Sequence, residues 1–359
     1  MISAPDSRSQ STPPALPLPE LFGRAMQLLG WQGITAHIPA DWNLAAFGGD
    51  ISKGNFRLVD DEGLRLEIFW DKPKGTPDIE RSIELLLERI EKDAKKKQQD
   101  FERIQNPKLI PRSRKEHAAK EQLINFGWKG DARNEIAHGW GASWHCASSK
   151  RVVVAHIIGR GTENPDKTQR LAAEILSTLD SQSKGGWQTW SAFGLQLDMP
   201  EEFELKSAKL QTGRLEFDWE RVAPHVPMKF LSPREWLRRK ERIGLRRISA
   251  ANIVLEIDSL EEWTRRVASV MFKKFRFWNF DGSKIGGEEA LVSRGALKDL
   301  RIHAAGWMLD RVLRRPSLPP ELVVWHNAAD NKIFVLFCDL WSVNAKIKND
   351  IIDSLESRQ

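Results

Sequence analysis

The sequence of 359 residues contains no tyrosine, although it has 15 Trp and 16 Phe. This absence excludes every acid, base or nucleophile that a tyrosine hydroxyl would supply. Cysteine is scarce as well, because only Cys146 and Cys338 are present and no CxxC pair occurs. A disulfide framework and a cysteine-rich zinc site are therefore excluded, and we expect a protein of the reducing cytoplasm.

Long hydrophobic runs are also missing. No stretch approaches the roughly 18–20 consecutive apolar residues of a membrane-spanning helix, so we expect no membrane contact. Residues 1–20 are rich in Ser and Pro and lack the apolar core of a secretory signal, which predicts a disordered tail. Apolar residues make up 41% of the sequence, enough to form cores, and its length favours two or three domains.

The sequence does contain an internal repeat. The phrase WHCASSKRVVVAH at residues 144–156 returns as WHNAADNKIFVLF at residues 325–337. Four other pairs of similar phrases occur, and all five have the same order in the two halves of the chain. The four are GWQG (30–33) with GWQT (186–189), IPADWNL (38–44) with MPEEFEL (199–205), RLEIFWDK (65–72) with RLEFDWER (214–221), and ILSTLD (175–180) with IIDSLE (351–356). These matches predict a tandem duplication, with a first repeat at 21–182, a linker at 183–186 and a second repeat at 187–358.

Both predicted repeats have the same order of elements. Strands rich in β-branched and aromatic residues are followed by a long amphipathic helix, capped at Thr76 in the first repeat and by a Ser259–Glu262 capping box in the second. Each WH segment is joined through a short polar turn to a strongly apolar strand, which predicts a hairpin, and an amphipathic helix ends the repeat. We therefore predict an α+β fold: two tandem copies of one domain, each an antiparallel sheet packed against helices.

This order of elements resembles the Mog1/PsbP-like fold, which includes bacterial proteins of the DUF1795 type. The resemblance is carried by Pro39, Trp42 and residues 175–179 in the first repeat, and by Pro200, Phe203 and residues 351–355 in the second. Members of that fold are largely non-enzymatic assembly factors, chaperones and binding modules. The resemblance implies a scaffold-like or chaperone-like binding protein with a protein partner, and we expect no catalytic residues and no cofactor.

An enzyme with a site around the first-repeat hairpin is an alternative. Its candidates are His138, Cys146 and His156, because the first two share one parity on their strand and His156 lies on the paired strand. No carboxylate completes a metal-ligand set, and Phe337 occupies the position of His156 in the second repeat, so we expect no metal site. His145 cannot act as the base for Cys146, since neighbouring residues on a strand point to opposite faces.

The repeated WH pair itself consists of Trp144 with His145 and Trp325 with His326. By the two-residue period of a strand, Trp and His point to opposite faces. We predict a buried packing Trp and a hydrogen-bonded His in each repeat.

A basic segment distinguishes the second repeat, and we interpret it as an insert over residues 225–250. Its basic residues are candidates for binding an acidic protein or a polyanion: Arg234, Arg238, Arg239, Lys240, Arg242, Arg246 and Arg247. In a helix over 230–249, Arg238, Arg242 and Arg246 would form one stripe. Lys273, Lys274 and Arg276 follow among the aromatic residues 272, 275, 277 and 278, which we expect to be exposed. Positive charge beside exposed aromatics suits phosphate contacts and base stacking, so nucleic-acid or other polyanion binding is a second alternative.

Overall fold

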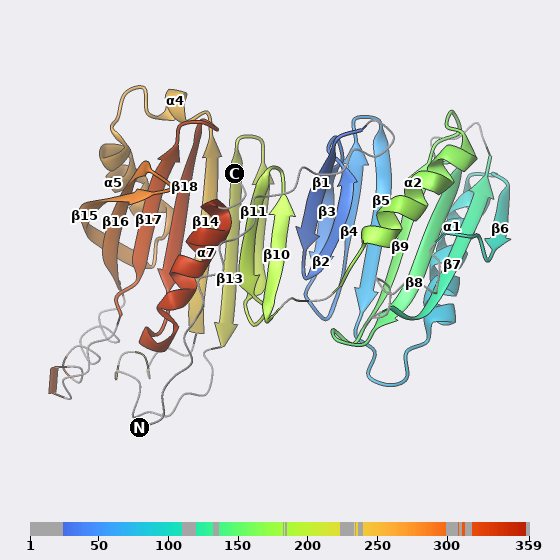
Figure 1. The fold of residues 1–359 in the computed structure, drawn as a ribbon, viewed down its shortest axis with the longest axis horizontal. Helices are drawn as coiled ribbons and strands as arrows, with labels where there is room; N and C mark the ends of the chain where they lie inside the picture. Colours follow the sequence, from blue (N-terminus) through green and yellow to red (C-terminus); the bar gives the residue numbers. More distant parts are fainter. Residues whose placement is uncertain are drawn as a thin grey trace. The chain divides into compact units, whose positions relative to one another are not determined.

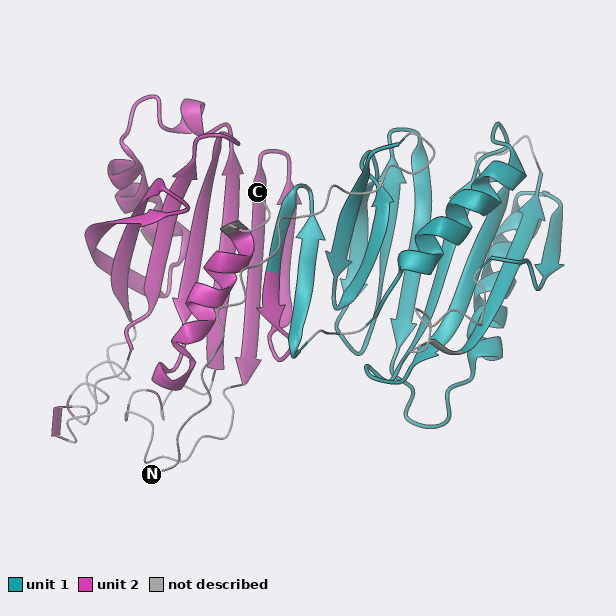
Figure 2. Cartoon of the chain, viewed as in Figure 1, with its two compact units in different colours: residues 1–197, 357–359 teal, residues 198–356 magenta. Residues whose placement is uncertain are grey.

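The structure is a computed structural model (Figure 1), and it describes residues 24–109, 120–131, 136–181, 183, 185–222, 233, 235, 240–298, 308, 311–312 and 318–356. The chain forms two compact units (Figure 2): unit 1 comprises residues 1–197 and 357–359, and unit 2 comprises residues 198–356. The predicted tail at 1–20 lies outside the described residues, as do residue 182 at the end of the predicted first repeat and residue 184 of the predicted linker. Among the described residues, no helix is both long enough and apolar enough to span a membrane.

Unit 1 is built on a seven-stranded antiparallel sheet with the order β3-β4-β5-β9-β8-β7-β6. The strands are β3 (Asn43–Gly49), β4 (Lys53–Asp60), β5 (Gly63–Asp71), β6 (Phe101–Gln105), β7 (Lys120–Gly130), β8 (His138–Cys146) and β9 (Arg151–Gly159). A further four-stranded sheet has the order β11-β10-β1-β2, from β1 (Met26–Trp31), β2 (Ile34–Pro39), β10 (Trp187–Ala192) and β11 (Leu195–Pro200). The predicted WH hairpin is confirmed in unit 1, because β8 and β9 pair antiparallel.

Two helices cover opposite faces of the unit 1 sheet. Helix α1 (Ile79–Lys96) buries Ile79 and Ile83 against Val152 and Val154 of β9. Since side chains alternate along a strand, the odd-numbered residues of β9 point to the other face, where helix α2 (Pro165–Thr178) packs on β8 and β9 (Figure 1). The predicted cap at Thr76 is wrong: Asp78 caps α1 by accepting a hydrogen bond from the Arg81 amide at 2.8 Å.

Unit 2 has a second seven-stranded antiparallel sheet, with the order β12-β13-β14-β18-β17-β16-β15. Its strands are β12 (Glu204–Gln211), β13 (Arg214–Val222), β14 (Lys240–Ser249), β15 (Phe275–Ile285), β16 (Glu288–Leu297), β17 (Glu321–Asn327) and β18 (Lys332–Asp339). Its helices are α4 (Ala251–Val254), α5 (Leu260–Met271) and α7 (Lys346–Glu356), with the short 3-10 helix η3 (Ser342–Asn344). The capping box of Ser259 and Glu262 at the start of α5 is confirmed, as is the second WH hairpin, β17–β18.

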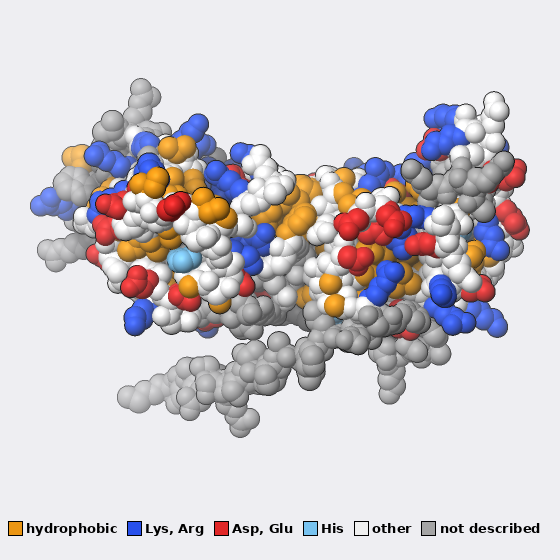
Figure 3. Space-filling view, turned by 90° about the horizontal axis from the view of Figure 1, so that it is seen from above, with side chains coloured by type: hydrophobic (Ala, Val, Ile, Leu, Met, Phe, Trp, Pro, Cys, Tyr) orange, Lys and Arg blue, Asp and Glu red, His pale blue; other side chains and the backbone are white. Residues whose placement is uncertain are grey.

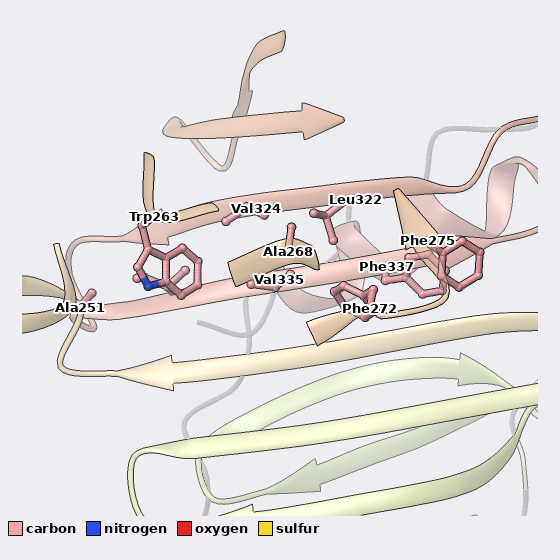
Figure 4. Packing of buried hydrophobic residues seen from close by; sticks show 10 residues of the cluster. Ala251, Trp263, Ala268, Phe272, Phe275, Leu322, Val324, Val335 and Phe337 are labelled. Carbon is pink, nitrogen blue, oxygen red and sulfur yellow. The ribbon is translucent and has the colours of Figure 1, made fainter. Parts of the chain in front are cut away.

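The core of unit 2 lies between α5 and the sheet (Figure 4). Trp263 and Ala268 of α5 face Val324 of β17 and Val335 of β18. At the other end of the cluster, Phe337 stacks on Phe272 with the ring centroids 4.8 Å apart. The α+β class with antiparallel sheets and covering helices is thus the architecture of both units.

The two large sheets agree in strand order and in register. Trp144 is paired with Val153 in unit 1, and Trp325 is paired with Phe334 in unit 2. A hydroxyl at the end of each last helix makes the same contact. Thr178 Oγ1 accepts a hydrogen bond from the His37 amide, and Ser354 Oγ accepts one from the Asp198 amide, each at 3.0 Å.

We expect the loss of either hydroxyl to destabilise only its own unit. Thr178→Val and Ser354→Ala should each lower the free energy of unfolding by about 1 kcal/mol, since each leaves a strand amide without its hydrogen-bond acceptor. Urea unfolding, read by hydrogen–deuterium exchange of peptides from each unit, measures both effects. A change in the exchange of the other unit would contradict this prediction.

The sequence interpretation of two segments was also wrong. The RLEIFWDK and RLEFDWER segments were predicted to be equivalent, but they are not. The first lies in β5 and the second in β13, whose counterpart by sheet order is β4. Residues 240–249 are neither an insert nor a helix, because they form β14, an inner strand that pairs with β13 and β18. Ile243 and Leu245 of β14 are almost completely buried, and such burial suits a strand of the sheet core.

Candidate functional site

Each unit has a cavity in the corresponding place. It lies beside the C-terminal end of α1 in unit 1 or of α5 in unit 2, and strands of the large sheet also line it. The unit 1 cavity has a volume of about 480 Å³ and the unit 2 cavity about 600 Å³. Both volumes are in the range of small-molecule and peptide side-chain sites.

The floor of the unit 1 cavity is a buried cluster of charged and polar side chains. Glu67 of β5 lies opposite His156 of β9 in the sheet register, and His156 Nε2 lies 2.8 Å from Glu67 Oε2. Arg57 Nε donates to Glu67 Oε1 at 2.6 Å, and Arg89 Nη2 of α1 donates to Glu67 Oε2 at 3.1 Å. Glu67 is 4% exposed and His156 is 1% exposed. One carboxylate therefore joins β4, β5, β9 and α1.

The electrostatics of this cluster fix the ionisation of Glu67. Burial opposes ionisation, but the hydrogen bond and charge of His156, together with the charges of Arg89 and Arg57, lower the pKa of Glu67 to about 2. Since the carboxylate is ionised at neutral pH, it accepts a hydrogen from His156 Nε2. The other ring nitrogen, Nδ1, is buried and has no hydrogen-bond partner among the described residues.

Apolar residues form the walls of the unit 1 cavity. Phe101 and Trp128 stack with their ring centroids 6.1 Å apart, and Ile90 and Ile158 also line the space. The charged residues of the lining are balanced in sign: Arg57, Arg89 and Lys97 against Glu67, Asp93, Asp100 and Asp131. The cavity thus combines an aromatic wall with a lining of small net charge.

Unit 2 replaces the charged floor by aromatic side chains. By sheet register, Phe337 stands in place of His156, Gly244 in place of Glu67 and Asp218 in place of Arg57. The ring centroid of Phe337 lies 4.5 Å from that of Phe275. The unit 2 cavity is therefore a space above an aromatic core, with its polar groups at the rim.

The lining of the unit 2 cavity is mainly basic. Seven Lys or Arg side chains and three carboxylates line it: Lys206, Lys209, Arg214, Arg242, Arg246, Lys273 and Lys274, with Glu216, Asp218 and Glu220. The arginines are paired with these carboxylates, as in Arg246 Nη2 to Asp218 Oδ1 at 2.6 Å and Arg242 Nε to Glu220 Oε2 at 3.1 Å.

Burial opposes ionisation of Glu220, but hydrogen bonds from Lys240 and Arg242 lower its pKa, which keeps its pairs charged at neutral pH. By contrast, Lys273 and Lys274 are exposed and have no ion-pair partner among the described residues. The neighbouring Val270 is 64% exposed. The free part of the rim therefore offers two cations and an apolar side chain together.

The candidate basic residues divide among several places. Arg234, Arg238 and Arg239 lie outside the described residues. Arg242 and Arg246 line the unit 2 cavity, and Lys240 is exposed and paired with Glu220. Arg247 has the opposite parity on β14 and is only 8% exposed. Burial lowers the pKa of Arg247. The single helical stripe of arginines is therefore wrong.

The aromatic residues near Lys273 are mostly core residues. Phe272 and Phe275 are 6% and 4% exposed, whereas Trp278 of β15 is 43% exposed. The expectation of an exposed aromatic row is thus wrong except at Trp278. Figure 3 shows Lys and Arg side chains lying among acidic and apolar side chains in each unit rather than in one continuous patch.

Both WH pairs lie in the hairpins predicted for them. Trp144 and Trp325 are buried, as predicted, and Trp325 stacks on Phe334 with a centroid distance of 5.1 Å. His145 and His326 are half-buried. The Nε2 atom of His326 has no hydrogen-bond partner among the described residues.

The first-repeat hairpin does not bring His138, Cys146 and His156 together. His138 and Cys146 are at opposite ends of β8, about 26 Å apart at the usual rise of a strand. They pair with Gly159 and Arg151, on the α2 face, whereas His156 belongs to the α1 face. Within the described parts of the chain, no group of His, Cys, Asp or Glu residues is placed to hold a metal ion.

Sequence reasoning found His156 but missed the partners that define its surroundings. Glu67 stands between Leu66 and Ile68 in an apolar strand. A lone carboxylate in such a strand is the sequence feature that could have identified Glu67 as part of the cluster. Arg57 and Arg89 reach it from β4 and α1, which no local pattern reveals.

No protein-family model matches the sequence, and no curated protein matches it. Two solved structures of the immunity protein TplEi of T6SS from Pseudomonas aeruginosa are similar. The complex with the "L" peptide has 10% identity and a TM-score of 0.30, covering 94% of this chain and 99% of that chain. The apo structure has 11% identity and a TM-score of 0.29, covering 94% and 97%. Similarity at these TM-scores carries no inference about this protein.

Proposed function

We propose that this protein is a non-enzymatic cytoplasmic binding or assembly protein that holds an acidic segment of a protein partner in the unit 2 cavity. The observation that carries the proposal is the free part of the rim, where the exposed Lys273 and Lys274 adjoin the exposed Val270. Carboxylates of a partner would pair with the two lysines while an apolar side chain covers Val270.

The chemistry of the unit 2 cavity supports binding rather than catalysis. Of the described residues that line it, none is a His, Cys, Ser or Thr. Its three carboxylates are held in ion pairs, as Glu216 is with Arg214 at 2.6 Å. Neither a histidine base nor a hydroxyl or thiol nucleophile is therefore present among these lining residues.

An acidic protein segment fits this rim better than a nucleic acid does. Phosphate contacts need available cations in a row, but the three arginines of the lining are already paired with Glu216, Asp218 and Glu220. Base stacking needs exposed aromatic faces, and Phe272 and Phe275 are buried. We therefore rank nucleic-acid binding second.

We also infer that units 1 and 2 are copies of one domain. The support is the shared strand order, the matching pairs of Trp144 and Trp325, and the equivalent hydroxyl contacts of Thr178 and Ser354. The Mog1/PsbP-like resemblance stays a prediction. On this inference, the two cavities are diverged versions of one place.

Charge reversal at the unit 2 rim tests the proposed function. K273E/K274E should weaken binding of an unstructured peptide of alternating Glu and Leu by at least about tenfold, because two attractive contacts become repulsive. Binding to the unchanged protein should weaken as salt rises. Isothermal titration calorimetry of the full chain measures both.

The matched control is K95E/K96E, which makes the same charge change at exposed positions of α1 in unit 1. It should leave the peptide affinity within about twofold, since these lysines belong to unit 1 and do not line the unit 2 cavity. If single-stranded DNA binds at low salt and displaces the peptide, the rim recognises polyanions in general. If K273E/K274E binds the peptide as tightly as the unchanged protein, the proposed site is wrong.

A further inference from the structure

Two arginines of the unit 1 cavity share a single carboxylate. Within the described residues, Arg57 reaches Glu67 through Nε alone and Arg89 reaches it through Nη2 alone. His156 occupies the same carboxylate as well, at 2.8 Å. One negative charge neutralises only one of the two guanidinium groups, so this part of the cavity keeps an excess of positive charge.

The unit 2 cavity is built differently at the corresponding place. By sheet register, the pair of Gly244 and Phe337 stands where unit 1 has Glu67 and His156. Each arginine of its lining has a carboxylate of its own, as Arg246 has in Asp218. The shared carboxylate is therefore a property of the unit 1 cavity, and the fold does not require it.

The unused donors of the two arginines are open to a ligand. The side chains of Arg57 and Arg89 are 47% and 43% exposed, and both residues line the cavity. The N–H groups of a guanidinium form a fork that matches a carboxylate, and such charge-assisted hydrogen bonds are stronger than neutral ones. The group that suits these donors is an organic anion.

The remaining lining indicates what the anion is attached to. Phe101 and Trp128 stack with their ring centroids 6.1 Å apart and offer an apolar wall. Two of the lining carboxylates lie beyond it, since Asp100 directly precedes β6 and Asp131 directly follows β7. Strands β9 and β8 separate β7 from Glu67 on β5. The charges of the lining nearly cancel in sum but are separated in space, which directs a carboxylate to the arginines and an apolar body to the wall.

We propose that the unit 1 cavity binds an organic carboxylate that bears an apolar ring. The carboxylate accepts hydrogen bonds from Arg57 and Arg89, and the ring lies against Phe101 and Trp128. The cavity volume of about 480 Å³ suits a ligand of this size. The carboxylate belongs either to a small molecule or to the C-terminus of a protein partner. The proposal is independent of the acidic segment assigned to unit 2.

The test compares phenylacetate with phenylacetamide and phenethylamine, which have the same ring but a neutral or a cationic end. The full chain is labelled with ¹⁵N-tryptophan, and NMR follows the indole signals of Trp128 in the unit 1 cavity and Trp219 in the unit 2 cavity. Phenylacetate should shift Trp128 and leave Trp219 unchanged. It should bind at least about tenfold more tightly than the amide, the effect of hydrogen bonds to a charged group, and the amine should bind more weakly still.

Arg57→Gln and Arg89→Gln should each reduce the preference for phenylacetate over the amide by at least about threefold. Each variant leaves Glu67 its other arginine, so the buried carboxylate keeps a partner. Arg103→Gln is the matched control and should retain the preference, because Arg103 is also paired with a carboxylate in unit 1, that of Glu84, but does not line the cavity. The comparison of the three ligands in the unchanged protein needs no variant, so it holds even if one of these variants does not fold.

The source of the carboxylate is decided by acetyl-Gly-Phe with a free C-terminal carboxylate. If this peptide binds more tightly than phenylacetate, the cavity receives the C-terminus of a partner, and if it binds more weakly, the ligand is a small molecule. Either result supports recognition of a ring-bearing carboxylate. The proposal is overturned if the amide or the amine binds as tightly as phenylacetate, or if none of the three binds at its highest soluble concentration. It is also overturned if phenylacetate shifts Trp219 as strongly as Trp128, or if Arg103→Gln lowers the preference as much as Arg57→Gln does.

Discussion

Glu67→Gln is expected to lower the free energy of unfolding of unit 1 by about 3 kcal/mol at pH 7. The pKa of Glu67 falls from the ordinary value of 4.5 to about 2 in the folded protein, and each pKa unit corresponds to about 1.4 kcal/mol of stabilisation of the ionised form. The amide keeps the shape of the carboxylate but removes the charge that His156, Arg57 and Arg89 share. The side chain of Glu67 is only 6% exposed, so solvent screens this loss little.

The same shift predicts how the stability of unit 1 depends on pH. Because the folded-state pKa of Glu67 is depressed, its contribution is fully present above about pH 4.5 and is lost as the pH falls towards 2. The difference between the unchanged protein and Glu67→Gln should therefore shrink as the pH falls through this window. Urea unfolding at several pH values measures it, with exchange of β5 and β9 peptides reporting on unit 1.

Glu84→Gln is the control for this prediction. Glu84 also pairs with an arginine, Arg103, but its side chain is 41% exposed. Its loss should cost no more than about 0.5 kcal/mol, as is usual for an ion pair at the surface. If the two Gln variants destabilise unit 1 equally, the buried cluster contributes nothing special to its stability.

These two carboxylates illustrate what the sequence reveals and what it does not. The hairpins of Trp144 and Trp325 were predictable because an apolar strand, a polar turn and a second strand are local patterns. The environment of Glu67 depends on residues from four elements, and their convergence is a property of the fold. Sequence alone therefore supplied His156 as a candidate without the carboxylate that orients it.

The basic segment shows a second limit, in the period of its pattern. Arg242 and Arg246 are four residues apart, and that spacing places two residues on one face of either a helix or a strand. The pair therefore could not distinguish the two. The buried Ile243 and Leu245 between them settle the matter in favour of β14. On this strand, Arg242 and Arg246 form ion pairs with Glu220 and Asp218 of the neighbouring strand.

Phe337→Ala is expected to destabilise unit 2 by about 3–5 kcal/mol, the largest effect we predict. Phe337 is 3% exposed and contacts the rings of Phe272, Phe275 and Phe277. Its removal leaves a void that these rings, fixed on the end of α5 and on β15, fill only in part. Phe337→Leu, which keeps most of the apolar volume, should cost less than about 1.5 kcal/mol.

Phe337→His introduces the residue that unit 1 has at this position, and we expect it to cost nearly as much as Ala. In unit 1 the imidazole is held by Glu67, but the corresponding residue here is Gly244, and Asp218 stands where Arg57 would be. An imidazole in this core has no carboxylate aligned with its Nε2, and its polar atoms are buried without partners.

Adding Gly244→Glu should not rescue Phe337→His. A Cβ atom at residue 244 would lie 3.1 Å from Asp218 Oδ1 and 3.2 Å from a ring carbon of Phe272, so the new carboxylate enters an occupied place beside a like charge. Urea unfolding of unit 2, followed by exchange of β14 and β18 peptides, measures all four variants. A double variant as stable as Phe337→Leu would show that two substitutions are enough to transfer the charged floor of unit 1 to unit 2. A double variant as unstable as Phe337→His would show that Arg57 and Arg89 are also required.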